Sequence, residues 1–333
     1  MRRILAAALA YLLLAAPAYA CAEEARTFFA MDTAMSLRIW GGDSALADAC
    51  VARIEQLEAL FSTTAEDSEI ARLNRCGACE LSEPTSELLN FALDICEATG
   101  GALDVTLYPV VRAWGFTTGE YRVPDEAELS ALLAHVGYRG VQLSAGAASL
   151  EPGAMVDLGS VAKGYVSDEL AELLRAGGVT SALIDLGGNI YCLGGKQDGS
   201  DWRIGVRDPF GEGYCAVLTR RDCAIVTSGS YERYFNAADG TRYGHIFDPS
   251  SGRPVENDLV SVTVTGESGA LCDALSTALF VMGSERAAGF LSGRSDVSAI
   301  LMRSDETFLV SRALAGSFAP AGAFASRTVE WLD

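Results

Sequence analysis

The chain has 333 residues, of which half are apolar and 21% are charged, so it is typical of a globular protein and not of a disordered one. Its formal net charge of −19 argues against nucleic acid or an anionic lipid surface as the partner of the folded part. An anionic ligand would have to be held locally, by backbone N–H groups, a metal ion or a few cationic side chains.

The first 20 residues have the features of a secretory signal peptide. Two arginines precede an apolar run over residues 4–16, and the Ala-x-Ala of residues 18–20 stands directly before Cys21. The apolar run is too short to span a membrane. Ordinary cleavage and lipoprotein processing, which would leave a lipid on Cys21, both stay open. We expect an exported protein, periplasmic or otherwise extracytoplasmic, whose only membrane contact would be that lipid.

Eight cysteines remain when Cys21 is set aside, and an even number in an exported chain is compatible with disulfides. Cys76 and Cys79 form a Cys-x-x-Cys pair. No second pair of this kind follows, and the whole chain has two histidines. We therefore favour a local disulfide or two free thiols over a zinc or redox site.

Hydrophobic periodicity predicts one strand and three helices in the first 135 residues, after a short tether over residues 21–27. The strand is interrupted at Met31, and the first two helices begin at the capping residues Ser44 and Ser82. The apolar and aromatic residues 103–116 are expected to be buried or to line a ligand. The four elements cover residues 28–40, 44–60, 82–99 and 126–135.

Residues 156–189 have the pattern of a small-residue turn, a helix and a buried strand that ends in a glycine turn. The helix is expected from about Lys163 to Ala176, and the strand ends in Gly187-Gly188-Asn189. Glycines let a phosphate approach the unpaired N–H groups of a helix start, where Lys163 would add positive charge. An ordinary helix start with a surface lysine remains the alternative. The pattern matches neither a P-loop nor a Rossmann fingerprint.

The second half of the chain is richer in strands. We expect them over residues 202–206, 216–220, 224–228, 243–247, 259–265, 297–303 and 307–310. Two helices, over residues 269–281 and 284–291, precede the last two strands, which are expected to close the chain. Antiparallel-looking strands with grouped helices favour an α+β fold, in one continuous domain over residues 28–333.

Two places could carry chemistry. Asp273 and Thr277 stand four residues apart on one helix, so they share a face with Ser276 beside them. A carboxylate and a hydroxyl suit Mg²⁺, although an aspartate near a helix start with a core-facing threonine is the structural alternative. His245 ends a strand before an Asp-Pro turn, where it could transfer protons or only donate a structural hydrogen bond.

Taken together and in this order, the motifs closely resemble the ApbE family of FAD:protein FMN transferases over about residues 28–310. The matching segments are 31–33, 68–74, 103–106 leading through to 114–116, 157–165, 187–189, 227–233, 245–249 and 273–278. The order of so many segments is specific where each motif alone is not.

The resemblance implies a T-fold-like α+β architecture and transfer of FMN from FAD to a threonine or serine of a partner protein. It implies an FAD site lined by Met31, Trp114, Gly115, Phe116, Asp157, Lys163 and Phe247. It implies Mg²⁺ ligands from Asp273, Thr277, Ser276 and the backbone carbonyl of Ser160, with His245 as the residue that deprotonates the acceptor. The family's usual Met-Gly-Thr is Met-Asp-Thr here, and its common Ser-Thr-Tyr is Ser-Thr-Thr at residues 62–64, which leaves the packing around FAD open.

Two other functions would use the same features. If water replaced the acceptor hydroxyl, the chain would be a Mg²⁺-dependent FAD pyrophosphatase. The second alternative is an exported FAD-binding protein without turnover, which would need no base such as His245. The acceptors implied by the family are exported or membrane-tethered flavoproteins, in which an Asp-Gly-x-Thr-like segment carries the acceptor threonine. Examples are subunits of sodium-pumping NADH:quinone reductases, Rnf-type complexes and extracytoplasmic reductases.

Overall fold

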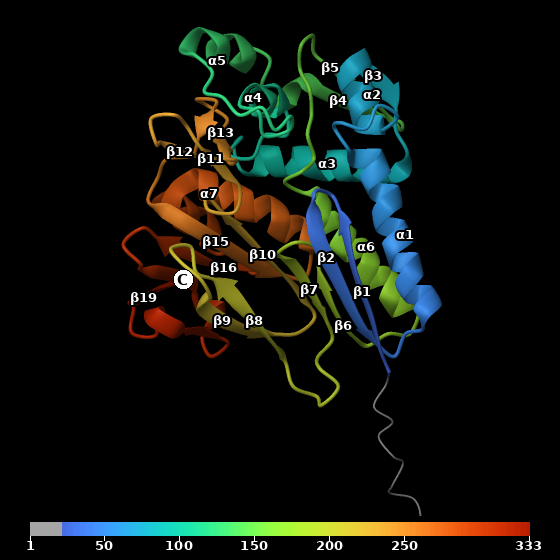
Figure 1. Ribbon diagram of the computed structural model, residues 1–333, viewed down its shortest axis with the longest axis vertical. Helices are drawn as coiled ribbons and strands as arrows, with labels where there is room; N and C mark the ends of the chain where they lie inside the picture. Colours follow the sequence, from blue (N-terminus) through green and yellow to red (C-terminus); the bar gives the residue numbers. More distant parts are fainter. Residues whose placement is uncertain (1–21) are drawn as a thin grey trace, which may run out of the picture.

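The computed structural model describes residues 22–333, so the predicted signal peptide and Cys21 lie outside the described residues. A nine-stranded sheet forms its centre (Figure 1). Across this sheet the strands follow the order β1 (Glu23–Ala30), β2 (Thr33–Trp40), β6 (Ser181–Asp185), β7 (Asn189–Leu193), β10 (Cys223–Gly229), β15 (Leu259–Gly266), β16 (Val297–Arg303), β17 (Phe308–Ser311) and β19 (Val329–Leu332).

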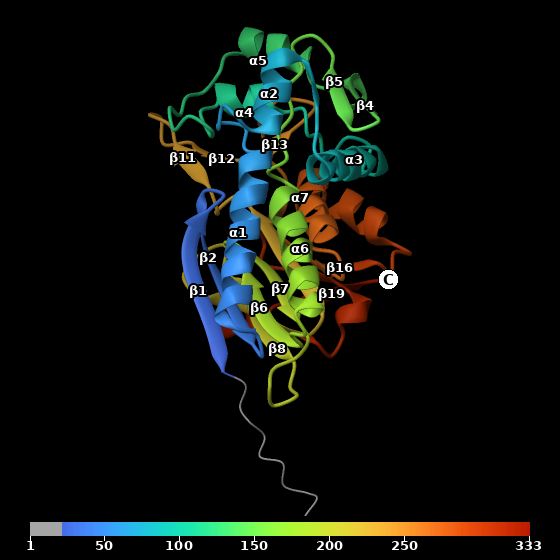
Figure 2. The same cartoon turned by 90° about the vertical axis from the view of Figure 1, so that its right-hand side faces the viewer.

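Helices cover one face of the central sheet and a smaller sheet covers the other (Figure 2). The helices are α1 (Ser44–Phe61), α6 (Ala162–Ala176) and α7 (Gly269–Leu291). The smaller sheet has the order β18 (Phe318–Pro320), β9 (Tyr214–Arg220) and β8 (Trp202–Arg207). Each face therefore has its own hydrophobic core, and this mixed arrangement confirms the predicted α+β class.

The remaining α-helices and several short strands gather at one end of the molecule, beyond the helical layer (Figure 1). The helices there are α2 (Glu69–Cys76), α3 (Glu83–Ala98), α4 (Tyr108–Ala113) and α5 (Glu126–Leu133). The strands are β3 (Ala78–Glu80), β4 (Val141–Ser144), β5 (Ala147–Leu150), β11 (Tyr234–Asn236), β12 (Arg242–Gly244), β13 (Phe247–Asp248) and β14 (Arg253–Pro254). Among residues 22–333, no helix combines the length and apolar character needed to cross a membrane.

The N-terminal strands form a hairpin where one interrupted strand was predicted. Met31 and Asp32 occupy the turn with φ of 47° and 59°, as a two-residue primed turn requires. The turn lets β1 pair with β2 from Glu23 onward, so residues 23–27, which we expected to be a tether, belong to the sheet. Because the turn contains no glycine, its sequence carries little signal for a reversal.

Helices α6 and α7 cross at two glycines. A Cβ atom on Gly164 would lie 2.2 Å from the carbonyl oxygen of Gly269, and one on Gly269 would lie 2.6 Å from that of Gly164. Asp168 of α6 fixes the start of α7, because its carboxylate accepts hydrogen bonds from the N–H groups of Gly269 at 2.6 Å and Ala270 at 3.0 Å. The crossing therefore sets the position of every residue in the first turns of α7.

Several boundaries differ from the sequence-based expectations. Helix α1 is capped by Asp43, whose side chain accepts from the N–H of Leu46, and not by Ser44. The strand expected over 243–247 is split between β12 and β13, and the chain continues past β17 into β18 and β19. The break expected between residues 281 and 284 is confirmed, since Gly283 has a non-helical φ of 75° inside α7.

None of the eight described cysteines is in a disulfide. Cys76 is exposed and Cys79 is half-buried, which matches the free-thiol alternative for this pair. The other six are buried, and burial raises the pKa of Cys50 to about 11 and that of Cys96 to about 12. Such thiols remain protonated and act as small apolar side chains.

We expect Gly164→Ala to destabilise the fold by about 1–3 kcal/mol, since the new methyl group would push α6 away from α7. Gly289→Ala in the exposed part of α7 is the matched control, because a Cβ there meets nothing within 4 Å. The control should be neutral or slightly stabilising. Urea unfolding of both variants checks this, and equal midpoints would contradict the importance of the crossing.

Candidate active site

A cleft of about 1020 Å³ opens at one end of the central sheet. It is bounded by the β1–β2 turn, the segment that leads into α4, the start of α6, the turn between β6 and β7, strand β8 and the first turns of α7. This volume lies at the upper end of the range for small-molecule sites. Elements from almost the whole chain therefore meet at one place.

Nine of the twelve predicted site residues line this cleft. They are Met31, Phe116, Asp157, Ser160, Lys163, His245, Phe247, Asp273 and Thr277. The three that do not line it are Trp114, Gly115 and Ser276.

Trp114 and Gly115 precede Phe116 in the chain and are packed inside the protein. The Trp114 side chain is fully buried, its Nε1 donates to the carbonyl of Gly252 at 2.9 Å, and its ring packs 5.7 Å from that of Phe247. Gly115 has a φ of 88°, and a Cβ there would lie 2.2 Å from the backbone oxygen of Glu120. In this structure both residues support the side chains that face the cleft, and their predicted contact with FAD stays a prediction.

Ser276 is also placed differently from the prediction. Its hydroxyl is fully buried, donates to the Asp273 carbonyl at 2.8 Å and lies 2.8 Å from the Ser228 hydroxyl. Its oxygen is therefore used inside the protein and is not presented to a metal. Ser228 itself lines the cleft and lies 3.3 Å from the Thr277 hydroxyl, a position that the sequence analysis missed.

Asp273 is a buried carboxylate with little compensation of its charge. The residue is 6% exposed, and its Oδ2 accepts a hydrogen bond from the N–H of Gly164 at 2.8 Å. Burial raises its pKa to about 6, although the positive charge of Lys163 acts in the opposite direction. No ion pair within residues 22–333 involves it.

The oxygen atoms around Asp273 fit a hard divalent cation. The carboxylate and the Thr277 hydroxyl come from adjacent turns of α7, and Ser160, just before α6, also lines the cleft. Residues 22–333 contain no group of three or more His, Cys, Asp or Glu side chains that could hold a metal. A few protein oxygens with open positions for water and phosphate suit Mg²⁺ better than a closed zinc site.

Asn189 is a second residue that the sequence analysis left without a role. It lines the cleft beside Asp273 and is 2% exposed, yet neither its Oδ1 nor its Nδ2 has a hydrogen-bond partner of good geometry. A buried amide that is not fully hydrogen-bonded costs free energy unless a ligand satisfies it. Its only sequence signal is the preceding Gly187-Gly188 pair, whose φ values are 73° and 93°.

The start of α6 supplies positive potential to the cleft. Its N-cap residue Val161 has no side-chain hydrogen bond to the helix, and Gly159, Ser160 and Lys163 all face the cleft. Asp157 at the same place accepts from the Gly159 N–H at 2.8 Å, and burial raises the pKa of its carboxyl group. A helix start of this kind can bind an anion through its free N–H groups, and the anion-binding role expected from the sequence stays a prediction.

His245 is held as a neutral imidazole with one free nitrogen. Its Nδ1 lies 3.1 Å from the carbonyl oxygen of Arg233. Because a carbonyl can only accept, Nδ1 carries the proton and Nε2 keeps its lone pair. Burial, aided by the charges of Arg233 and Lys163, lowers the pKa of the ring to about 4. His245 is therefore available as a base throughout the neutral range.

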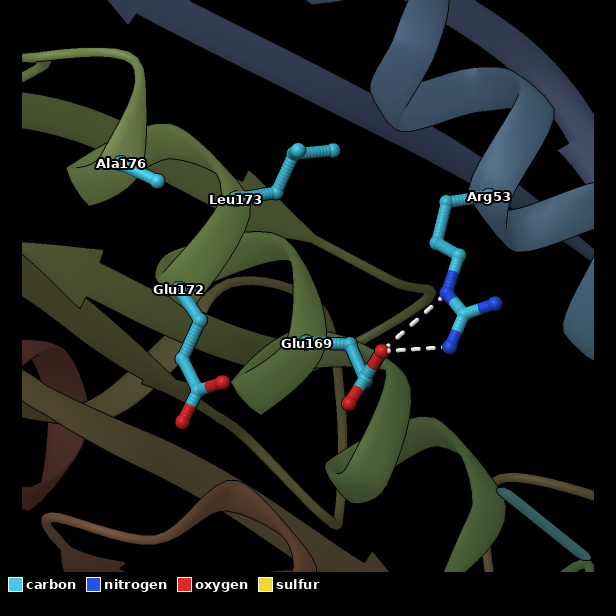
Figure 3. A pocket seen from close by; sticks show the side chains of 5 residues that line it. All are labelled: Arg53, Glu169, Glu172, Leu173 and Ala176. Atoms are coloured by element: carbon cyan, nitrogen blue, oxygen red, sulfur yellow. Dashed lines mark hydrogen bonds and ion pairs between the residues drawn. The ribbon is translucent and has the colours of Figure 1, made fainter. Parts of the chain in front are cut away.

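A second cavity, of about 320 Å³, lies between α1 and α6, away from these residues. Figure 3 shows an ion pair between two of its lining residues, in which Arg53 donates to Glu169 at 2.7 Å. Its other lining residues are Glu172, Leu173 and Ala176, which offer no nucleophile and no set of metal ligands. This cavity therefore does not compete as the catalytic site.

Comparison with known proteins identifies relatives that match most of the chain. A model of the ApbE family matches residues 31–301. An FAD:protein FMN transferase of Treponema pallidum is 37% identical over 274 residues, which cover 76% of this chain and 75% of the relative. An FAD:protein FMN transferase of Vibrio cholerae is 35% identical, with coverage of 77% and 78%.

Solved structures agree with the sequence comparison. The crystal structure of the ApbE protein of Thermotoga maritima matches with a TM-score of 0.83 at 29% identity and covers 89% of this chain and 99% of that one. The flavin transferase ApbE of Vibrio cholerae matches with a TM-score of 0.77 at 30% identity, with coverage of 91% and 99%. From its sequence, its fold and the composition of its cleft, the chain belongs to the ApbE family.

Proposed function

We propose that this chain transfers FMN from FAD to a threonine or serine hydroxyl of a partner protein and releases AMP. The observation that carries the proposal is the meeting, in one cleft, of a neutral histidine with a free Nε2 and a buried carboxylate beside a helix start. Relatives that match most of the chain are FAD:protein FMN transferases. The size of the cleft is also compatible with a dinucleotide.

In this proposal Asp273, Thr277 and the carbonyl of Ser160 hold Mg²⁺. When bound, the ion neutralises charge on the two phosphates and on the departing AMP. Lys163 and the N–H groups at the start of α6 bind the same phosphates from the protein side. These local groups allow a chain with a net charge of −19 to bind an anionic pyrophosphate.

His245 performs the proton transfer. The acceptor hydroxyl oxygen forms a bond to the FMN phosphorus while the bond from that phosphorus to the oxygen of the AMP phosphate breaks. The hydroxyl proton passes to His245 Nε2, since Nδ1 is already protonated and bound to the Arg233 carbonyl. Phe116 and Phe247 provide the apolar wall on which a flavin ring can pack.

We also propose that the chain acts outside the cytoplasm, where its acceptors are exported or membrane-tethered flavoproteins. The basis is the signal-peptide pattern of residues 1–20 and the resemblance to a family of exported enzymes. Subunits of sodium-pumping NADH:quinone reductases, Rnf-type complexes and extracytoplasmic reductases are the classes to test. A lipid on Cys21 would add a membrane anchor to the same chain.

The direct test uses the chain without residues 1–20, FAD, Mg²⁺ and an acceptor domain with an Asp-Gly-x-Thr segment. We expect the intact mass of the acceptor to increase by one FMN unit, with one AMP released per transfer. Free FMN and AMP with an unmodified acceptor would identify a pyrophosphatase instead. Bound FAD without either product would identify a binding protein.

We expect His245→Gln to lower the transfer rate by about 10²–10⁴-fold while FAD affinity is retained, because the general base is lost. His135→Gln is the matched control: His135 is exposed, its Nδ1 also lies 3.0 Å from a carbonyl, and it does not line the cleft. A full transfer rate in His245→Gln would remove the proposed role.

The pH dependence gives a separate test of His245. With its pKa lowered to about 4, the imidazole is largely unprotonated from about pH 5 upward. At saturating Mg²⁺ the transfer rate should therefore not fall as pH decreases through 6.5, the ordinary value for histidine. A rate that halves near pH 6.5 under these conditions would show that a normally titrating histidine controls the reaction.

We expect Thr277→Val to raise the Mg²⁺ concentration needed for half-maximal AMP release by at least tenfold. Ser276→Ala should change it less than threefold, because the Ser276 hydroxyl is bound inside the protein. Asp273→Asn should abolish Mg²⁺-dependent turnover, since it removes the charged ligand. Equal effects of the Thr277 and Ser276 substitutions would contradict the assignment of ligands.

A further inference from the structure

Strand β8 lines the cleft, and one of its edges has no partner strand within residues 22–333. In the sheet β18-β9-β8 it pairs only with β9, and residues 203–207 all contribute to the cleft wall. The backbone groups on the outer edge of such a strand can bind an added extended segment. The wall that carries β8 is separate from α6 and α7, which carry the phosphate and metal residues.

The outward face of β8 carries two arginines. Trp202, Ile204 and Val206 point into the core between the two sheets, whereas Arg203 and Arg207 are exposed. Arg203 makes no hydrogen bond or ion pair with any residue between 22 and 333. Arg207 pairs with Glu232 at 3.3 Å. At least one cation in this wall is therefore available to a ligand.

An exposed aromatic ring lies between the two arginines. A Cβ atom on Gly205 would be 2.3 Å from Cδ1 of Tyr214, so the tyrosine ring covers the glycine backbone. The Tyr214 residue is nevertheless 62% exposed and lines the cleft. Tyrosine and arginine are the residues most enriched at the centres of protein interfaces.

We propose that β8 is the docking strand for the acceptor protein, which binds along its edge as an extended segment with an acidic side chain opposite Arg203. The proposal rests on the transferase function and names the surface that selects the partner. In a chain of net charge −19, an unpaired cation at the cleft wall favours an acidic segment over a basic one. An extended segment also places its hydroxyl group inside the cleft without a folded domain having to enter it.

The same arginine could instead contact the FAD phosphates, and the two possibilities predict different kinetics. Docking of the acceptor affects the KM for the acceptor and leaves the FAD dissociation constant unchanged. Binding of FAD by Arg203 changes the FAD dissociation constant and the rate of AMP release together. The measurement must therefore follow both substrates.

The test compares Arg203→Glu with wild type in the transfer assay described above. We expect the KM for the acceptor to rise at least tenfold and the FAD dissociation constant to change less than twofold. Changing the aspartate of the acceptor's Asp-Gly-x-Thr segment to lysine should restore at least part of the loss with Arg203→Glu and weaken transfer by wild type. Tyr214→Ala should raise the same KM, because it removes the exposed ring.

Arg286→Glu is the matched control, since Arg286 is an exposed arginine on α7 that does not line the cleft. It should leave both constants unchanged. The docking proposal would be overturned if Arg203→Glu left the KM for the acceptor unaltered, or if it weakened FAD binding as much as it raised that KM. Transfer by wild type would still support the enzyme function in either case. Absence of an FMN-modified acceptor with wild type would overturn both.

Discussion

The contact between α6 and α7 is the constraint on which the candidate site depends. Because Gly164 and Gly269 have no side chains, the two helix backbones approach closely enough for the N–H of Gly164 to donate to the Asp273 carboxylate. Asp168 secures the same crossing from the other side through the start of α7. A helix start with positive potential and a buried carboxylate are thereby placed together, although 109 residues separate them in the chain.

This arrangement concentrates unlike charges in an otherwise acidic protein. Asp273 has a raised pKa since burial disfavours its ionised form, and Lys163 opposes that effect without forming an ion pair with it. A divalent cation would complete the compensation, and the Asn189 amide beside Asp273 is not fully hydrogen-bonded within the protein. The site is therefore electrostatically incomplete by itself, which is the condition expected of a place that binds a metal and phosphates.

The sequence predicted the helices that carry the site, because periodicity and the glycines near residues 164, 269 and 283 are local signals. It also predicted that His245 and Asp273 would matter, through the order of motifs. It did not predict which side chains face inward: Trp114 and Ser276 lie next to cleft residues in the chain but point into the core. The direction of a side chain and the partners of Asn189 or Ser228 depend on tertiary contacts that no local pattern encodes.

The cleft contains residues from Met31 to Val281, and its walls join the first hairpin of the sheet to the last long helix. The N–H of Met31 in the turn donates to the Glu58 carboxylate, and Thr33 packs against Gly187. The N-terminal hairpin also pairs with β6, a strand that lies about 150 residues later in the sequence. Contacts of such long sequence separation slow folding, because chain entropy is lost before they form. Ligand binding should therefore appear only when folding is complete, and a chain that lacks either end of this range would lack one wall of the cleft.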